Sequence, residues 1–243
     1  TGASAGIGRG VALELARRGF TVYATARRAD ELETLAAEAE DLPGRIVAAP
    51  GDVTDRELMA ALHAEIEQET PIALVVANAG GGWRDASDDF GGAGFQRTFA
   101  VNVQGVANTV HPALNAMQAR GRGQIAIVGS LIGYGGVPNS YAYGPSKAAV
   151  VSLAVGLKFA AEPKGVRVQL VNPGYVRTEL TANNRYPMPF LMECDDACRR
   201  IADGLRRGGF EIRFPRRLAF LVRLTQSLPY PLFFALFRAF GMR

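Results

Sequence analysis

Short apolar runs alternate with longer stretches of helical periodicity along most of this chain, and this alternation restricts its fold more than any other feature. Ile7, Val11 and Leu15 lie four residues apart and predict a first helix, and segments 30–33 and 54–57 have the form of capping boxes that open the next two. Strands joined by helices form right-handed βαβ units. We therefore predict an α/β fold, a doubly wound parallel sheet with helices on both faces. The strands are expected at residues 20–24, 45–49, 72–76, 124–128 and 167–171.

The composition fits a single domain with one appended segment. Apolar residues make up 48% and charged residues 21% of the 243 residues, so a sizeable core is available and disorder is not expected. No linker-like stretch or internal repeat divides the chain. We expect one domain over residues 1–215 and an apolar, Arg-rich C-terminal helical extension over residues 216–243.

Histidine and cysteine are scarce. Two residues of each leave too few ligands for an ordinary structural zinc site and no disulfide scaffold. Cys194 and Cys198 are four residues apart, which places them on one face of a helix. We interpret them as reduced thiols and expect a cytoplasmic protein. His63 lies in an acidic helix and is expected at the surface.

The net charge of +4 comes from the end of the chain. Five of the 27 basic residues and no acidic residue lie in residues 216–243, so the remainder is nearly neutral and offers no surface for nucleic acid. Phe and Leu residues at helical spacing are interrupted there by Pro229 and Pro231, which argues against a membrane-spanning helix. Two interpretations stay open: an apolar helix that closes the substrate crevice or packs on a partner subunit, or peripheral docking on an anionic membrane.

A glycine-rich segment, Thr1-Gly2-Ala3-Ser4-Ala5-Gly6-Ile7-Gly8, precedes the first predicted helix. Such glycines let the backbone turn tightly and approach a pyrophosphate, whose charge is favoured at a helix N-terminus. After the next strand, Arg27 and Arg28 stand where an acidic residue would bind the ribose hydroxyls of NAD, and no acid appears before Asp30. Arginine there accommodates a 2′-phosphate and predicts NADP(H), the alternative being two solvated surface charges.

With motifs farther along, this segment resembles the short-chain dehydrogenases/reductases, a family with a Rossmann-like fold. It resembles the family's TGxxxGxG motif, and residues 51–53 (GDV), 78–80 (NAG), 143–147 (YGPSK) and 172–178 (NPGYVRT) follow in the family's order. The predicted cofactor contacts are Gly2, Ser4, Gly6, Ile7, Gly8, Arg27, Arg28, Asp52, Val53, Asn78, Ala79, Gly80, Tyr143, Lys147, Pro173, Gly174, Val176 and Thr178. The resemblance also implies a homodimer or homotetramer. It implies a strand ahead of Gly2 as well, so we expect about ten more residues before Thr1.

The resemblance implies a catalytic tetrad of Asn102, Ser130, Tyr143 and Lys147. Tyr143 and Lys147 share one helix face, so the ammonium can lower the pKa of a phenol, ordinarily about 10. Tyr143 would then exchange a proton with a substrate oxygen while hydride passes between carbon and nicotinamide. Tyr141 has no charged residue at that spacing. Ser130 follows an apolar strand and would hydrogen-bond the substrate oxygen.

Asn102 falls at the edge of an apolar helical stripe, where a buried amide needs hydrogen-bond partners. In the family this residue helps to hold a water in a proton relay to the lysine; the alternative is an Asn that only packs. Trp83 and its neighbours Asp85, Asp88 and Asp89 lie in a glycine-rich loop and are expected to be solvated.

We therefore predict an NADP(H)-dependent oxidoreductase that interconverts a carbonyl compound and an alcohol. Residues 179–195, which cover the substrate in the family, include Tyr186, Met188, Phe190 and Met192 and predict a hydrophobic substrate, unless this loop packs on its own core. The main alternative is an inactive NADP(H)-sensing binding protein of the same fold. The complete tetrad argues against it, because sensing needs no phenol. A nucleotide-binding methyltransferase would share the glycine-rich segment but not the tetrad.

Overall fold

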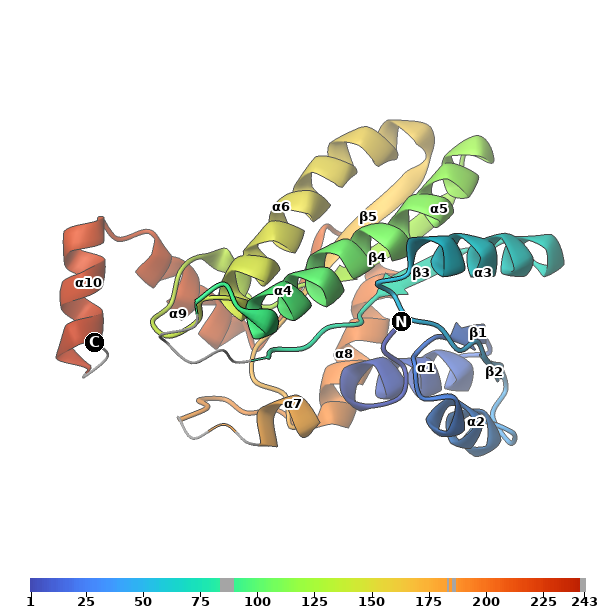
Figure 1. Ribbon diagram of the computed structural model, residues 1–243, viewed down its shortest axis with the longest axis horizontal. Coiled ribbons are helices and arrows are strands. Elements are labelled where there is room, and N and C mark those ends of the chain that lie inside the picture. Colours follow the sequence, from blue (N-terminus) through green and yellow to red (C-terminus); the bar gives the residue numbers. More distant parts are fainter. Residues whose placement is uncertain (84–89, 183, 185–186, 241–243) are drawn as a thin grey trace.

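The computed structural model describes residues 1–83, 90–182, 184 and 187–240 (Figure 1). Asp85, Asp88, Asp89 and Tyr186, which the sequence places in loops, lie outside the described residues. The strands are β1 (Thr21–Ala24), β2 (Arg45–Ala48), β3 (Leu74–Ala77), β4 (Gly123–Val128), β5 (Val166–Pro173) and β6 (Glu211–Phe214). The α-helices are α1 (Gly6–Arg17), α2 (Ala29–Glu38), α3 (Arg56–Glu69), α4 (Ala93–Phe99), α5 (Gly105–Ala119), α6 (Tyr143–Ala161), α7 (Glu179–Ala182), α8 (Cys194–Arg207), α9 (Arg216–Gln226) and α10 (Tyr230–Ala239). Shorter turns are η1 (Ala100–Gln104), which is π-helical, and the 3₁₀ turns η2 (Leu131–Tyr134) and η3 (Glu162–Lys164).

The strands pair in parallel, as predicted, in the order β1–β2 and β3–β4–β5–β6. Residues 1–3 pass between the two groups. The amino group of Thr1 donates a 2.9 Å hydrogen bond to the carbonyl of Val76 in β3, and the amide of Ala3 donates a 3.2 Å bond to Thr25, just after β1. The strand expected ahead of Gly2 stays a prediction.

Helices cover both faces of the larger sheet (Figure 1). Ile125 of β4 packs with Val110 of α5 and Val150 of α6 in one apolar cluster, whereas Ala126 packs with Ile201 of α8 in another. Neighbouring strand residues point to opposite faces, so each face has its own core. The chain is thus a Rossmann-like α/β domain, as predicted.

The starts of α2 and α3 differ from the predicted capping boxes. Asp30 lies inside the first turn of α2, and the N-cap of that helix, Arg28, makes no side-chain cap. The N-cap of α3 is Asp55, whose carboxylate accepts a 3.0 Å bond from the amide of Leu58. Thr54 precedes the N-cap by one residue, and its amide and hydroxyl both donate to Asp52 instead of taking part in a capping box.

His63 is buried rather than at the surface, where the sequence placed it. It lies on the face of α3 that also buries Met59 and Ile66, and α3 packs against α5. Its Nδ1 atom has no hydrogen-bond partner, and burial lowers the pKa of the ring. Of the acidic residues around His63 in the sequence, Glu65 and Glu69 are exposed, whereas Glu67 is half-buried and pairs with Arg120.

The described part of the C-terminal extension forms two helices, α9 and α10, which are separated by residues 227–229. Helix α9 packs against η2 and β6, whereas α10 stands away from the sheet at one end of the molecule (Figure 1). None of the described helices is both long and apolar enough to cross a membrane.

Candidate active site

A cleft of about 540 Å³ opens where the carboxyl ends of the strands meet the glycine-rich segment. Every residue that the sequence assigned to the cofactor lines this cleft, and Ser130 lines it too. Segments far apart in the sequence therefore meet around one volume: the start of α1, the ends of β1 and β3, the first turn of α6 and the chain after β5.

The glycine-rich segment forms the floor of the cleft. Gly2 and Gly6 have φ angles of +67° and +54°, which L side chains rarely adopt. A Cβ atom at Gly8 would collide with the carbonyl of Gly2, so the backbone closes tightly there. Helix α1 then starts with no capping side chain and no acidic residue in its first turn. Its N-terminal amides are available to an anion, which fits a pyrophosphate.

Two arginines follow β1 at one end of the cleft. The guanidinium of Arg28 donates to the hydroxyl of Ser4 at 3.1 Å and to its carbonyl at 3.3 Å. Arg27 lies 4.0 Å from Asp52. Burial would raise the pKa of Asp52, but the hydrogen bonds from Thr54 and the charge of Arg27 outweigh it and lower the pKa. An anionic group here would meet two guanidiniums and a hydroxyl.

Tyr143 and Lys147 lie on one face of α6, as the spacing predicts. The Lys147 Nζ atom is 5.7 Å from the centroid of the Tyr143 ring. The Lys147 residue is 4% exposed, and its Nζ atom donates a 2.9 Å hydrogen bond to the carbonyl of Val128, the last residue of β4. Burial lowers the pKa of Lys147 from 10.5 to about 8, so the ammonium still predominates at neutral pH. A buried cation therefore lies beside the phenol ring.

Asn102 is fully buried in the π-helical turn η1, and its amide is satisfied on both sides. It accepts a 2.9 Å bond from the amide of Gly81 and donates bonds of 2.9 Å to the Gly81 carbonyl and to Ser146 Oγ. A Cβ atom added at Gly80 would lie 3.1 Å from Asn102 Oδ1 and 3.2 Å from Lys147 Nζ. Asn102 thus ties the loop after β3 to the first turn of α6.

Ser130 caps η2 directly after β4. Its hydroxyl accepts a bond from the amide of Ile132 and donates one to the carbonyl of Pro173, both at 3.4 Å. These bonds are long, so the hydroxyl is loosely held. Strand β4 therefore positions two members of the predicted tetrad, by presenting Ser130 and by binding Lys147.

A half-buried carboxylate that is linked to the turn after Ser130 was not anticipated from the sequence. Glu211 of β6 accepts hydrogen bonds from Tyr134 at 2.6 Å and from Asn172, Arg213 and Arg223 at 2.7 Å each. Burial works against its charge, but these donors outweigh burial and lower the pKa of Glu211. Burial and the bond to Glu211 raise the pKa of Tyr134 to about 12. The side chain of Arg223 also lies over the Tyr134 ring, 4.6 Å from its centroid.

This network holds α9 against the two segments that meet at Ser130. Tyr134 ends the η2 turn that Ser130 begins, and Asn172 precedes Pro173, whose carbonyl Ser130 contacts. Gln226 of α9 adds a 2.8 Å bond to the carbonyl of Gly136. Helix α9 of the C-terminal extension therefore stabilises the segments that position Ser130 in the cleft.

Trp83 is part of the cleft wall, not a solvated loop residue. It is half-buried, and the guanidinium of Arg97 lies 4.5 Å from its ring centroid. Glu179, Leu180 and Thr181 of α7 also line the cleft. Of the predicted substrate loop, Phe190 is 46% exposed, and Met192 pairs with Val176.

Comparison with known proteins agrees with this geometry. A model of the short chain dehydrogenase family matches residues 1–188. The chain belongs to the short-chain dehydrogenase family. It is an oxidoreductase of that family, and the resemblance drawn from its motifs is confirmed.

Individual relatives of this short-chain dehydrogenase span most of its length. An uncharacterized oxidoreductase of Myxococcus xanthus (strain DK1622) is 40% identical over 237 residues, which cover 96% of this chain and 92% of the relative. A short-chain dehydrogenase from Sphingobium yanoikuyae, solved in complex with NADPH, superposes with a TM-score of 0.80 at 28% identity and covers 88% and 85% of the two chains. A bulky-bulky ketone specific alcohol dehydrogenase from Comamonas testosteroni gives a TM-score of 0.78 at 26% identity and covers 93% and 90%.

Proposed function

We propose that this short-chain dehydrogenase is an NADP(H)-dependent oxidoreductase that interconverts a carbonyl compound and an alcohol. The observation that supports this most strongly is the pairing of Tyr143 with the buried ammonium of Lys147 in the same cleft as the open N-terminus of α1. A phenol beside a cation is suited to proton exchange, and a free helix N-terminus is suited to a dinucleotide.

The residues around the cleft fit NADP(H) as the cofactor. The amides at the start of α1 would hold the pyrophosphate, and Ser4, Arg27 and Arg28 would hold the 2′-phosphate. Asp52 and Val53 would contact the adenine, and Val176 and Thr178 would lie along the nicotinamide end. When bound, the cofactor supplies or accepts a hydride. The NADPH complex of the Sphingobium relative adds support for the phosphorylated form.

The tetrad residues would transfer the proton and bind the substrate oxygen. The Tyr143 hydroxyl donates its proton to the oxygen during reduction and takes it back during oxidation. The charge on Lys147 stabilises the phenolate that remains after donation. Ser130 turns its loosely held hydroxyl toward the same oxygen, and Asn102 holds the loop after β3 beside Lys147, in keeping with the water relay that the family resemblance implies.

We propose a hydrophobic ketone or alcohol as the substrate. Leu180 and Trp83 present apolar surface to the cleft, and the Comamonas relative is described as specific for bulky ketones. An NADPH-oxidation screen over carbonyl compounds of increasing apolar size tests this. Higher kcat/KM for the larger ketones supports the proposal, and a preference for small charged carbonyls rejects it.

The proposal extends to assembly and location. We propose a homodimer or homotetramer, because Val155 and Phe159 of α6 expose 41% and 77% of their surface and offer an apolar contact to a partner subunit. Light scattering of the full chain and of Phe159→Glu, which should dissociate, tests this.

We also propose a cytoplasmic location, since Cys194 and Cys198 are both free thiols.

We further propose peripheral membrane contact through α9 and α10. Phe220 and Leu224 lie one helical turn apart on α9 and are 67% and 53% exposed, and Arg216 is exposed one turn before them. On α10, Tyr230 is 77% exposed. The segment has no acidic residue, so two copies of it would repel each other, whereas an anionic lipid surface complements it.

A further inference from the structure

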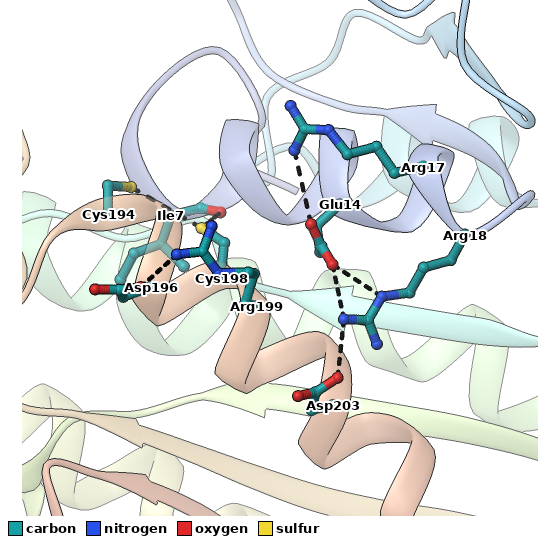
Figure 2. A network of polar contacts seen from close by, with 9 residues as sticks. All are labelled: Ile7, Glu14, Arg17, Arg18, Cys194, Asp196, Cys198, Arg199 and Asp203. Carbon is teal, nitrogen blue, oxygen red and sulfur yellow. Dashed lines mark hydrogen bonds and ion pairs between the residues drawn. The ribbon is translucent and has the colours of Figure 1, made fainter.

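The two cysteines of the chain lie together outside the cleft, at the start of α8 (Figure 2). Cys194 is the first residue of the helix and is half-buried, and Cys198 follows one turn later with 2% of its surface exposed. Their Sγ atoms are 3.9 Å apart. The sequence contains no other cysteine, so any disulfide within one chain must join these two.

The pair faces the helix that begins at the glycine-rich segment. Cys198 Sγ lies 3.6 Å from the carbonyl of Ile7, and a Cβ atom added at Gly10 would lie 2.5 Å from the same sulfur. Farther along, Arg18 of α1 bonds Asp203 of α8 at 2.9 Å (Figure 2). An ion pair therefore joins α1 and α8 at one end of their interface. At the end nearest the cleft, the Cys198 sulfur packs against Ile7 and Gly10 of α1.

The two thiols differ in reactivity. The hydrogen bond with Cys198 lowers the pKa of the Cys194 thiol, against the opposing effects of burial and of the Asp195 charge. That bond and burial both raise the pKa of Cys198. Cys194 also lies in the first turn of α8, where a helix N-terminus favours negative charge. Cys194 is thus the partly exposed nucleophile, with a protonated partner in van der Waals reach.

We propose that Cys194 and Cys198 form a thiol-oxidation site at which hydrogen peroxide produces a reversible disulfide within α8. The Cys194 thiolate attacks one peroxide oxygen; an S–O bond forms, the O–O bond breaks and hydroxide leaves. The Cys198 sulfur then attacks Cys194; the S–S bond forms and the S–O bond breaks, and the departing oxygen leaves as water with the Cys198 proton. The two thiols lose two electrons, and the peroxide is reduced to two waters once the first hydroxide takes up the proton that Cys194 released.

Closing this disulfide requires the first turn of α8 to open. Cβ atoms four residues apart on a helix are separated by about 5–6 Å, whereas a disulfide needs about 3.8 Å. Opening breaks few hydrogen bonds: the 3.1 Å bond from the Ala197 amide to the Glu193 carbonyl is lost, but the first four amides of a helix lack intrahelical partners and Glu193, the N-cap, makes no side-chain cap. A disulfide formed under such strain is reduced easily, which suits a reversible modification.

Oxidation of the cysteine pair should lower the affinity of the cleft for NADPH. Drawing Cys198 toward Cys194 withdraws its sulfur from Ile7 and Gly10, and these residues belong to the first turns of α1. We expect NADPH to bind about tenfold more weakly to the oxidised chain, which corresponds to about 1.4 kcal/mol. This consequence rests on the proposed function, whereas formation of the disulfide does not.

The test treats the full chain with hydrogen peroxide and measures two quantities. Mass spectrometry after alkylation reports the fraction of Cys194 joined to Cys198, and NADPH fluorescence reports the dissociation constant before oxidation, after it and after dithiothreitol. We expect the disulfide in the wild type, weaker NADPH binding, and recovery of both on reduction. Cys194→Ser and Cys198→Ser each remove one thiol with a small change in side-chain size, and peroxide should leave their NADPH binding unchanged.

Several results would overturn this inference. Peroxide that yields only sulfinic or sulfonic acid at Cys194, or disulfides between two chains on a non-reducing gel, excludes the intrahelical site. An unchanged NADPH dissociation constant in the disulfide form excludes the coupling to α1. A reduced chain that binds no NADPH contradicts the proposed cofactor instead, and the mass-spectrometric result then decides the oxidation site by itself.

Discussion

The Tyr134 hydroxyl donates a 2.6 Å hydrogen bond to Glu211, although 77 residues separate them in the sequence. This bond joins the turn after Ser130 to β6, and Arg223 of α9 binds the other oxygen of the same carboxylate. The side chain of Glu211 is only 9% exposed. The position of the turn that begins at Ser130 therefore depends on α9 of the C-terminal extension as well as on β4.

Glu211→Gln keeps the shape of this side chain and removes its charge. We expect the free energy of unfolding to fall by about 1.5–3 kcal/mol, because the hydrogen bonds from Tyr134 and Asn172 to this shielded carboxylate lose their charge assistance. Urea unfolding measures the change. Arg213→Gln is the matched control, since Arg213 binds the same carboxylate from an exposed position, and it should cost less than about 1 kcal/mol. Equal effects of the two substitutions would contradict the role of the buried network.

The sequence predicted those parts of the molecule that local periodicity encodes. Spacing alone predicted five strands, the first helix and the shared face of Tyr143 and Lys147. The position of Asn102 in an apolar stripe predicted that its buried amide needs hydrogen-bond partners, and Ser146 is one of them. Strand β6 was missed because it has four residues and alternates charged with apolar side chains. Its pattern is too short to distinguish from a loop.

Features that depend on distant contacts had no local signal. The Glu211 network joins residues from four elements, and Trp83 reaches the cleft only through the fold of a glycine-rich loop. His63 is buried because α5 covers its helix, which the neighbouring acidic residues conceal in the sequence. The predicted cap of α3 at Thr54 is displaced by one residue, because the Asp55 carboxylate accepts from the amide of Leu58 and Thr54 is bonded to Asp52.

Lys147 should give folding stability a pH dependence of known sign. Burial lowers its pKa from 10.5 to about 8, so between these values the unfolded chain holds a proton that the folded chain lacks. The free energy of unfolding should therefore rise with pH over this window, by up to about 3 kcal/mol from this residue. Urea unfolding from pH 8 to pH 10 should show the rise in the wild type and in Lys164→Met, whose lysine is exposed, but not in Lys147→Met. Parallel curves for all three would show that Lys147 keeps an ordinary pKa.

Cofactor preference should follow the charges after β1. The double variant Ala26→Asp/Arg27→Ala introduces a carboxylate for the ribose hydroxyls and removes one guanidinium. We expect the NADPH dissociation constant to rise by about ten- to a hundredfold and NADH binding to improve, since a charge-assisted hydrogen bond contributes about 1.5–3 kcal/mol. Fluorescence titration measures both cofactors. Arg45→Ala, an exposed arginine outside the cleft, should change neither, and an unaltered preference in the double variant would refute the assignment of the arginines.

Membrane contact should depend on exposed side chains of α9. Phe220→Ser should weaken binding of the full chain to anionic vesicles by about tenfold, because a Phe side chain that enters the lipid contributes about 1.5–3 kcal/mol. Flotation with phosphatidylserine vesicles measures this, and neutral phosphatidylcholine vesicles should bind less. Phe20→Ser alters another exposed ring, 49% accessible, and serves as the control, because Phe20 directly precedes β1, which lies far from α9 (Figure 1). Wild-type chain that floats with neither vesicle would reject the contact.

The most direct test of the account is the turnover of Tyr143→Phe, measured as NADPH oxidation with the best ketone from the screen, together with its NADPH dissociation constant. Tyr141→Phe is the control, because its ring is exposed and lies outside the cleft. Loss of the Tyr143 hydroxyl should lower kcat by about 10²–10⁴-fold and leave NADPH binding within about twofold of the wild type, whereas Tyr141→Phe should retain both. Undiminished turnover in Tyr143→Phe, or a wild-type chain that binds NADPH and reduces no carbonyl compound, as an NADP(H) sensor would, contradicts the proposed proton transfer.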